Sequence, residues 1–71
     1  MKVKMVIKTP LGEFKAKEQN LTEQEFQEQQ LTFFDKIGSM NSLKFKDEYD
    51  NVIVLPKETL WNSVIVFNLS K

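Results

Sequence analysis

The N-terminal part of the chain alternates between apolar and charged positions, which is the pattern of a β-strand with one face in the core. Residues 3, 5 and 7 are apolar and alternate with lysines at positions 2, 4 and 8, and only Val6 breaks the alternation. Residues 9–12 read Thr-Pro-Leu-Gly, with proline at the second and glycine at the fourth position of a predicted turn. Residues 13–17 alternate again, so the pattern predicts a β-hairpin with one lysine-rich face.

A helix is predicted to follow, because the sequence has both a start signal and a helical period. Thr22 and Glu25 have the spacing of a capping box, in which each side chain bonds the backbone N–H of the other residue. Gly38 is the expected end of the helix. Large apolar residues between these limits recur at helical spacing and form one stripe of about 100°. The stripe, which we expect to pack on the sheet, consists of Phe26, Phe33, Phe34 and Ile37.

Two residues of this helix do not fit a simple amphipathic pattern. Gln30 lies in the middle of the apolar stripe, where we expect its amide to find a backbone partner at the edge of the core. Setting the register of a helix pair is the alternative role for Gln30. Leu31 points away from the stripe, and it is either an ordinary exposed leucine or part of a contact with a partner.

The C-terminal half of the chain predicts three more strands. Leucine and phenylalanine alternate with lysine over residues 43–46, and the polar segment 47–51 is the expected turn into a strand over 52–55. Pro56 ends that strand and opens a short helical turn over 57–61, after which residues 63–69 form the last strand. The prediction is a single α+β domain over residues 1–71, with a small antiparallel sheet, one helix packed on one face and the order ββαβββ.

The last two strands carry more apolar residues than one covered face requires. Since one helix covers only one face of a sheet, Val64 and Val66 are expected to lie on the opposite face in an apolar strip flanked by lysines. The residues beside them on the neighbouring strand are one of two pairs: Val52 and Val54, or Ile53 and Leu55.

The small size of the chain also indicates a partner. Short chains bury a smaller fraction of their surface than long ones, and most add a disulfide, a metal or a subunit contact. A disulfide is excluded because the 71 residues include no cysteine. Trp61 either caps the core or anchors an interface. We therefore predict a homo-oligomer, with an interface drawn from Leu31, Val52, Val54, Trp61, Val64 and Val66.

The composition argues against catalysis. Without histidine or cysteine, the chain lacks the usual zinc ligands, the commonest general base and the strongest nucleophile. Asp47, Glu48 and Asp50 lie close together, but the glycine that a calcium-binding loop needs at its sixth position is missing. We expect no enzyme activity, no catalytic residue, no cofactor and no metal. No apolar run is long enough for a secretory signal or a membrane span, so a cytoplasmic protein without a membrane partner is expected.

The charge distribution suggests an alternative function. The net charge is zero, but five lysines of the predicted hairpin lie on its outer face and offer a track for nucleic-acid phosphates. These residues are Lys2, Lys4, Lys8, Lys15 and Lys17. The absence of arginine and of an aromatic residue on that face argues against this use. The same asymmetry also suits a protein contact between the basic hairpin of one copy and the acidic helix of another.

The segment Leu55 to Phe67, LPKETLWNSVIVF, resembles small accessory proteins of phages and prophages of low-GC Gram-positive bacteria. In those proteins a strand ends in a Pro-Lys-Glu turn and a new strand begins at Asn-Ser. The resemblance implies an accessory, chaperone-like role in virion assembly or host takeover, in which the protein binds another phage or host protein in the host cytoplasm. It assigns no active-site residue.

Overall fold

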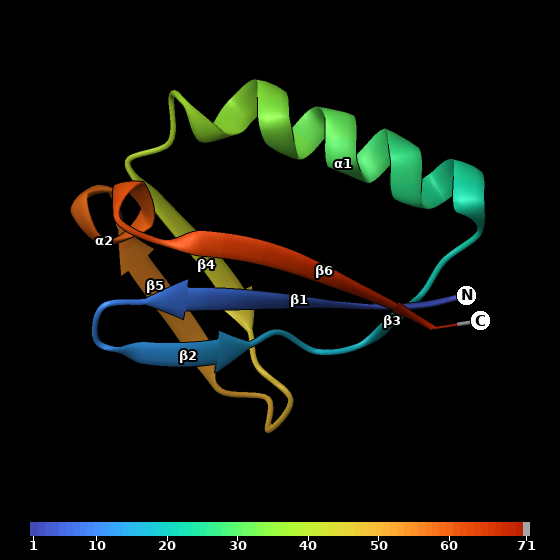
Figure 1. Cartoon of the computed structure of the whole chain (residues 1–71), viewed down its shortest axis with the longest axis horizontal. Coiled ribbons are helices and arrows are strands. Elements are labelled where there is room, and N and C mark those ends of the chain that lie inside the picture. The colour runs from blue at the N-terminus through green and yellow to red at the C-terminus, as the bar shows by residue number, and fades with distance from the viewer. Residues whose placement is uncertain (71) are drawn as a thin grey trace.

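The computed structural model describes residues 1–70, which form strands and helices in the order shown in Figure 1. The elements are β1 (Lys2–Thr9), β2 (Gly12–Lys15), β3 (Gln19–Asn20), α1 (Glu23–Ile37), β4 (Ser42–Lys46), β5 (Val52–Pro56), α2 (Lys57–Trp61) and β6 (Val64–Ser70). The predicted α+β class and the order of the main elements are confirmed. The short strand β3 is an addition that no sequence pattern indicated.

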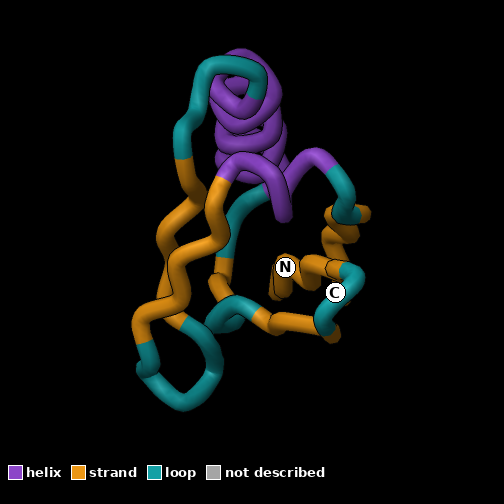
Figure 2. Tube along the Cα trace, turned by 90° about the vertical axis from the view of Figure 1, so that its left-hand side faces the viewer, coloured by secondary structure: helices purple, strands orange, loops and turns teal. Residues whose placement is uncertain are grey.

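β1 is the central strand of the fold. It pairs antiparallel with β2 and β3 along one edge and with β6 along the other, while β4 and β5 form a separate two-stranded sheet. The single sheet of the sequence-based prediction is thus divided in two. The sheets meet where the Lys17 N–H donates to the Lys46 carbonyl at 3.0 Å, beside the bridge between Ala16 and Asp47. From this corner the strands diverge, so that the two sheets face each other with α1 across the open side (Figure 2).

The core lies between the two sheets and is closed at one end by α2. Ile7 of β1 is fully buried and packs with Leu43, Leu55 and Leu60. Alternation along the strands explains the first three residues, because the inward strand positions are the apolar ones that the sequence pattern selects, while Leu60 comes from α2. Val6 breaks the pattern, since it is only 3% exposed on the outer face of β1. It lies beside Lys4 and Lys8 on that face, and the aliphatic parts of lysine side chains can cover an apolar neighbour.

α1 begins and ends as the sequence predicts. The Glu25 N–H donates to Thr22 Oγ1 at 3.1 Å and the Thr22 N–H donates to Glu25 Oε1 at 3.0 Å, which completes the capping box. The C-cap is Gly38. The local signals therefore determine both ends of this helix.

The packing of α1 differs from the prediction. No residue of the helix is buried, and its attachment rests on Phe26 and Phe33, whose rings meet the Phe67 ring edge to face at 5.8 and 6.1 Å. The expected contact of Phe34 with the sheet is wrong, because this side chain is 57% exposed. Phe34 is eight residues from Phe26 and so lies about 80° away around the helix axis. A helix that touches one strand along a narrow line leaves such a position in solvent.

Candidate functional site

The apolar surface residues that the sequence predicts as an interface lie on four different elements, α1, β5, α2 and β6. Val64 is 61% exposed and Val66 is half-buried on the outer face of β6, whereas Val52 and Val54 are 54% and 55% exposed on β5 in the other sheet. Leu31 lies on α1. The expected strip in which the two pairs of valines lie side by side is not formed, because β5 and β6 do not pair. The alternative pair, Ile53 and Leu55, faces the core.

β6 has a free edge. Among the described strands it pairs with β1 alone. The Ala16 N–H donates to the Met5 carbonyl at 2.8 Å, so the backbone groups of Met5 point away from β6. Since these groups alternate along an antiparallel strand, Lys4, Val6 and Lys8 bond to β6. Phe67 and Ile65 lie opposite Met5 and Ile7, so their N–H and C=O groups point outward at the free edge. Leu69, two residues after Phe67, has the same orientation.

The free edge of β6 lacks the features that normally prevent strands from pairing with another chain. It runs over seven residues, VIVFNLS, without a charge or a proline. Edge strands of soluble proteins are usually short, charged, bulged or covered, because an exposed row of N–H and C=O groups is a template for another strand. β6 is thus a surface on which a further strand can add.

The flank of α1 on the side of this edge carries one exposed aromatic residue, Phe34. The opposite flank, with Glu25, Gln29 and Thr32, lines a depression together with Met40, which leads into β4. By helical spacing, Phe34 lies on the flank of the helix away from this depression, and α1 runs above β6 in the view of Figure 1. Sequence analysis missed this residue as an interface candidate, because helical periodicity assigned it to the core.

Trp61 does not cap the core. Its side chain is 69% exposed, and the residue of α2 that is buried is Leu60. The ammonium group of Lys57 lies 5.4 Å from the centre of the indole ring, which is a cation–π distance. The expectation that Trp61 covers the core is wrong, and the indole remains available to a partner.

A cavity of about 450 Å³ lies between α1 and the sheets. Its apolar lining consists of Val3, Met5, Ala16, Phe26, Phe33, Phe45 and Phe67, and its polar rim of Lys17, Glu18, Gln19, Gln29, Gln30 and Lys46. The volume is within the range of small-molecule pockets. Gln30 is among the lining residues, and its side chain has no hydrogen bond among residues 1–70, so the backbone partner that we expected is not found.

The lysines of the N-terminal hairpin are partly neutralised by the turn between β4 and β5. The Lys4 ammonium lies 3.2 Å from Glu48, and Lys8 pairs in register with Glu13. Lys2 and Lys15 are exposed. The predicted track of five lysines is therefore interrupted by carboxylates.

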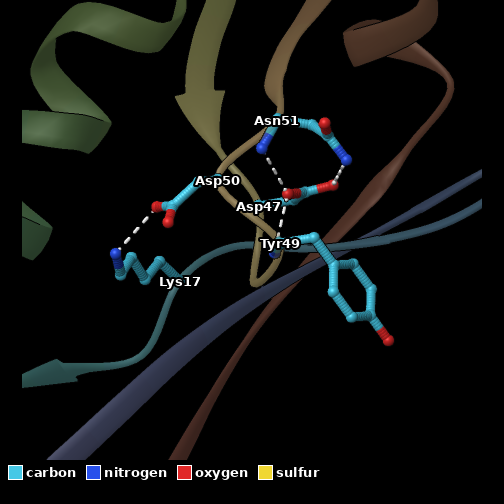
Figure 3. A network of polar contacts seen from close by, with 5 residues as sticks. All are labelled: Lys17, Asp47, Tyr49, Asp50 and Asn51. Atoms are coloured by element: carbon cyan, nitrogen blue, oxygen red, sulfur yellow. Dashed lines mark hydrogen bonds and ion pairs between the residues drawn. The ribbon is translucent and has the colours of Figure 1, made fainter.

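Asp47 organises the turn that supplies these carboxylates (Figure 3). It accepts hydrogen bonds from the backbone N–H groups of Tyr49 and Asn51 at 2.9 and 2.8 Å. Loss of water around the carboxylate raises the pKa of Asp47, but these bonds and one from the Asn51 amide outweigh that effect and lower the pKa below its ordinary value. The turn places Asp50 2.8 Å from the Lys17 ammonium. The acidic cluster thus has a structural role in the hairpin.

Among residues 1–70, no three acidic, histidine or cysteine side chains lie close enough together to hold a metal ion. No helix in this range is both long and apolar enough to span a membrane. The features that the fold presents are therefore the free edge of β6, the exposed apolar side chains, the outer lysines and the cavity under α1.

Comparison of the chain with known proteins finds no matching family model, no matching curated protein and no matching solved structure.

Proposed function

We propose that this chain is a non-enzymatic protein-binding module that forms a homo-oligomer through the free edge of β6. The observation that carries the proposal is the uncharged, unpaired edge of this strand, from Val64 to Ser70. Backbone hydrogen bonds at such an edge bind another strand of suitable shape, and side chains next to the edge select the partner. A second copy of the chain offers the same edge at the same concentration.

The side chains around the edge support an antiparallel pairing of β6 with its copy. In an antiparallel pairing centred on Ile65, the outward N–H and C=O groups of this residue bond to Ile65 of the partner copy, and Val64 of each copy lies opposite Val66 of the other. Val64 and Val66 then meet apolar neighbours on one face of the joined sheet, and Phe34 lies on the other. The contact uses one patch on both subunits, which is the arrangement of a two-fold dimer.

The exposed area of the isolated chain supports a partner as well. The chain exposes 5235 Å², whereas surface scaling for a monomeric protein of this mass gives about 4,600 Å². The difference of roughly 600 Å² is close to the area of about 800 Å² that each partner buries in a standard interface. An assembly through β6 would bring the exposed surface per chain to an ordinary value.

Nucleic-acid binding has less support. Among the five hairpin lysines, Lys4 and Lys17 are in ion pairs and Lys8 faces Glu13. All ten basic residues are lysine, so the bidentate contacts of arginine with bases and phosphates are not available. An accessory role in phage assembly, suggested by the segment 55–67, stays a prediction.

The proposal is tested by placing a charge beside the edge. Val64→Lys introduces an ammonium group at an exposed position, and its copy across a two-fold axis would repel it. In light scattering coupled to size exclusion at about 500 mM salt, where contacts between exposed charges are screened, we expect the wild type at twice the chain mass of 8.4 kDa and the variant at the chain mass. The control is Leu11→Lys, which changes an 86% exposed leucine in the β1–β2 turn and should leave the dimer intact. A wild type that stays monomeric at millimolar concentration would contradict the proposal.

A further inference from the structure

The outer face of the second sheet joins two lysines to two valines. In the β4–β5 register Lys44 lies opposite Val54, and Lys46 lies opposite Val52. Both valines are more than half exposed, and neither lysine has an ion pair within the part of the chain that the structure describes. These four residues are called the Lys–Val face. Sequence analysis predicted lysines on the wet face of residues 43–46, but their valine partners depend on the register of the hairpin.

The outer side of α1 has the complementary character. Leu31 is 66% exposed, and Glu28 and Asp35 lie one turn before and after it on the same side of the helix. Glu28 and Asp35 have no ion pair among residues 1–70. The line from Glu28 through Leu31 to Asp35, called the acidic ridge, points away from the stripe of Phe26 and Phe33 that meets the sheet. It is apart from Phe34, which lies nearer to β6.

We propose that the Lys–Val face of one copy binds the acidic ridge of a second copy. Leu31 then packs on Val52 and Val54, and the two lysines reach the two carboxylates. This inference rests on the proposed self-association and adds a second contact to it. We infer a second copy as the partner because the two surfaces of the chain are complementary. The ridge has carboxylates that can pair with the lysines of the face, and a leucine that can pack on its valines.

The distances along the two elements are compatible with this contact. Lys44 and Lys46 are two residues apart on a strand, which is about 6.7 Å. Glu28 and Asp35 are two helical turns apart, which is about 10.5 Å. Lysine stems are long and flexible enough to span the difference, while the leucine between the carboxylates meets the apolar half of the face. The other lysine-bearing surface, on the N-terminal hairpin, is less suitable because Lys4 and Lys17 are already in ion pairs with Glu48 and Asp50, and Glu13 lies opposite Lys8 in the register.

The two surfaces are different, so the contact is head-to-tail. Such contacts build rings if the rotation closes and filaments if it does not. Together with a two-fold contact through β6, the Lys–Val face would link dimers into larger assemblies. Because the charges are exposed, the linkage should weaken as salt screens them.

Charge reversal with complementary partners tests the inference. One variant carries Lys44→Glu and Lys46→Glu, and the other carries Glu28→Lys and Asp35→Lys. Each variant alone brings like charges together and should lose all species larger than the dimer in sedimentation velocity. In an equimolar mixture, the face of each variant meets a ridge of opposite charge on the other variant. The mixture should therefore form species larger than the dimer again. For the wild type, the apparent association constant beyond the dimer should fall about tenfold from roughly 50 to 500 mM salt.

Controls separate this contact from a loss of folding and from the β6 contact. Lys2→Glu with Lys8→Glu makes the same change in net charge on the other sheet and should leave the assembly unchanged. Circular dichroism verifies that each charge variant is folded. Val64→Lys added to both charge variants removes the β6 contact, and the mixture should still associate through the face and the ridge.

The outcomes distinguish the two proposals. A wild type with no species beyond the dimer at low salt, or a mixture that stays at the mass of its separate variants, overturns the head-to-tail contact while the β6 dimer stands. If Val64→Lys has no effect on mass but the mixture associates, the β6 proposal fails and the head-to-tail contact is supported.

Discussion

β1 and α1 are the two most regular amphipathic segments of the chain, yet the fold uses them in opposite ways. β1 has strands on both edges, and its residues Val3, Val6 and Ile7 are at most 5% exposed. α1 has a complete capping box and the longest helical period, but none of its residues is buried. The difference shows that burial follows from the number of neighbours around an element. The strength of the local signal decides only whether the element forms.

The largest effect is expected from truncation of the central residue of β1. Ile7→Ala removes a fully buried side chain between the two sheets and should lower the free energy of unfolding by about 3 to 4 kcal/mol. For a domain of this size, that is a large part of the total stability. Urea denaturation followed by circular dichroism measures the change. Leu11→Ala, at an exposed turn position, is the control and should stay within about 0.5 kcal/mol. A loss below 1 kcal/mol for Ile7→Ala would mean that the core lies elsewhere.

A smaller effect of opposite sign is expected where α1 faces the cavity. Gln30→Leu replaces an amide that lines an apolar space with a side chain that fills it, and should raise the free energy of unfolding by about 1 kcal/mol. The matched control is Gln27→Leu, at an exposed position of the same helix, where no gain is expected. Equal effects of the two variants in urea denaturation would show that the cavity has no influence on how α1 is held.

The smallest effect concerns the first turn of α1 and its dependence on pH. The backbone N–H of Thr22, followed by its hydroxyl, lowers the pKa of Glu25 below its ordinary value. A carboxyl whose pKa is lower in the folded chain stabilises the fold above its unfolded pKa, and this contribution is lost as the pH falls through the folded value. Amide hydrogen exchange in the first turn should therefore become faster, relative to β1, as the pH is lowered below about 4.

Glu25→Gln provides the comparison for this pH effect. The glutamine keeps a side-chain oxygen for the Thr22 N–H but does not titrate in this range, so the acid-dependent part of the exchange in the first turn should disappear. An unchanged pH profile in the variant would assign the effect to another carboxylate.

The N-terminal hairpin and the Lys–Val face show where sequence reasoning about the site reaches its limit. Both surfaces are lysine strands with one wet face, and the alternation of residues predicts each of them. In the fold, Lys4 and Lys17 meet Glu48 and Asp50, which follow them by 44 and 33 positions in the chain. The lysines of β4 have valines opposite them. Pairs of residues so far apart in the chain are brought together by the register and curvature of the sheets. No pattern among neighbouring residues of the sequence indicates such pairs.

The sequence by itself determined the main elements of this protein, with the exception of the short strand β3. The capping box at Thr22, the turn at Pro10 and the interruption at Pro56 act through neighbouring residues, and each is found where the pattern places it. Only the tertiary structure decided that the strands divide into two sheets, that β6 has a free edge and that Phe34 lies in solvent. The physical reason is that backbone pairing and burial depend on residues far apart in the chain, whereas caps and turns depend on residues a few positions apart.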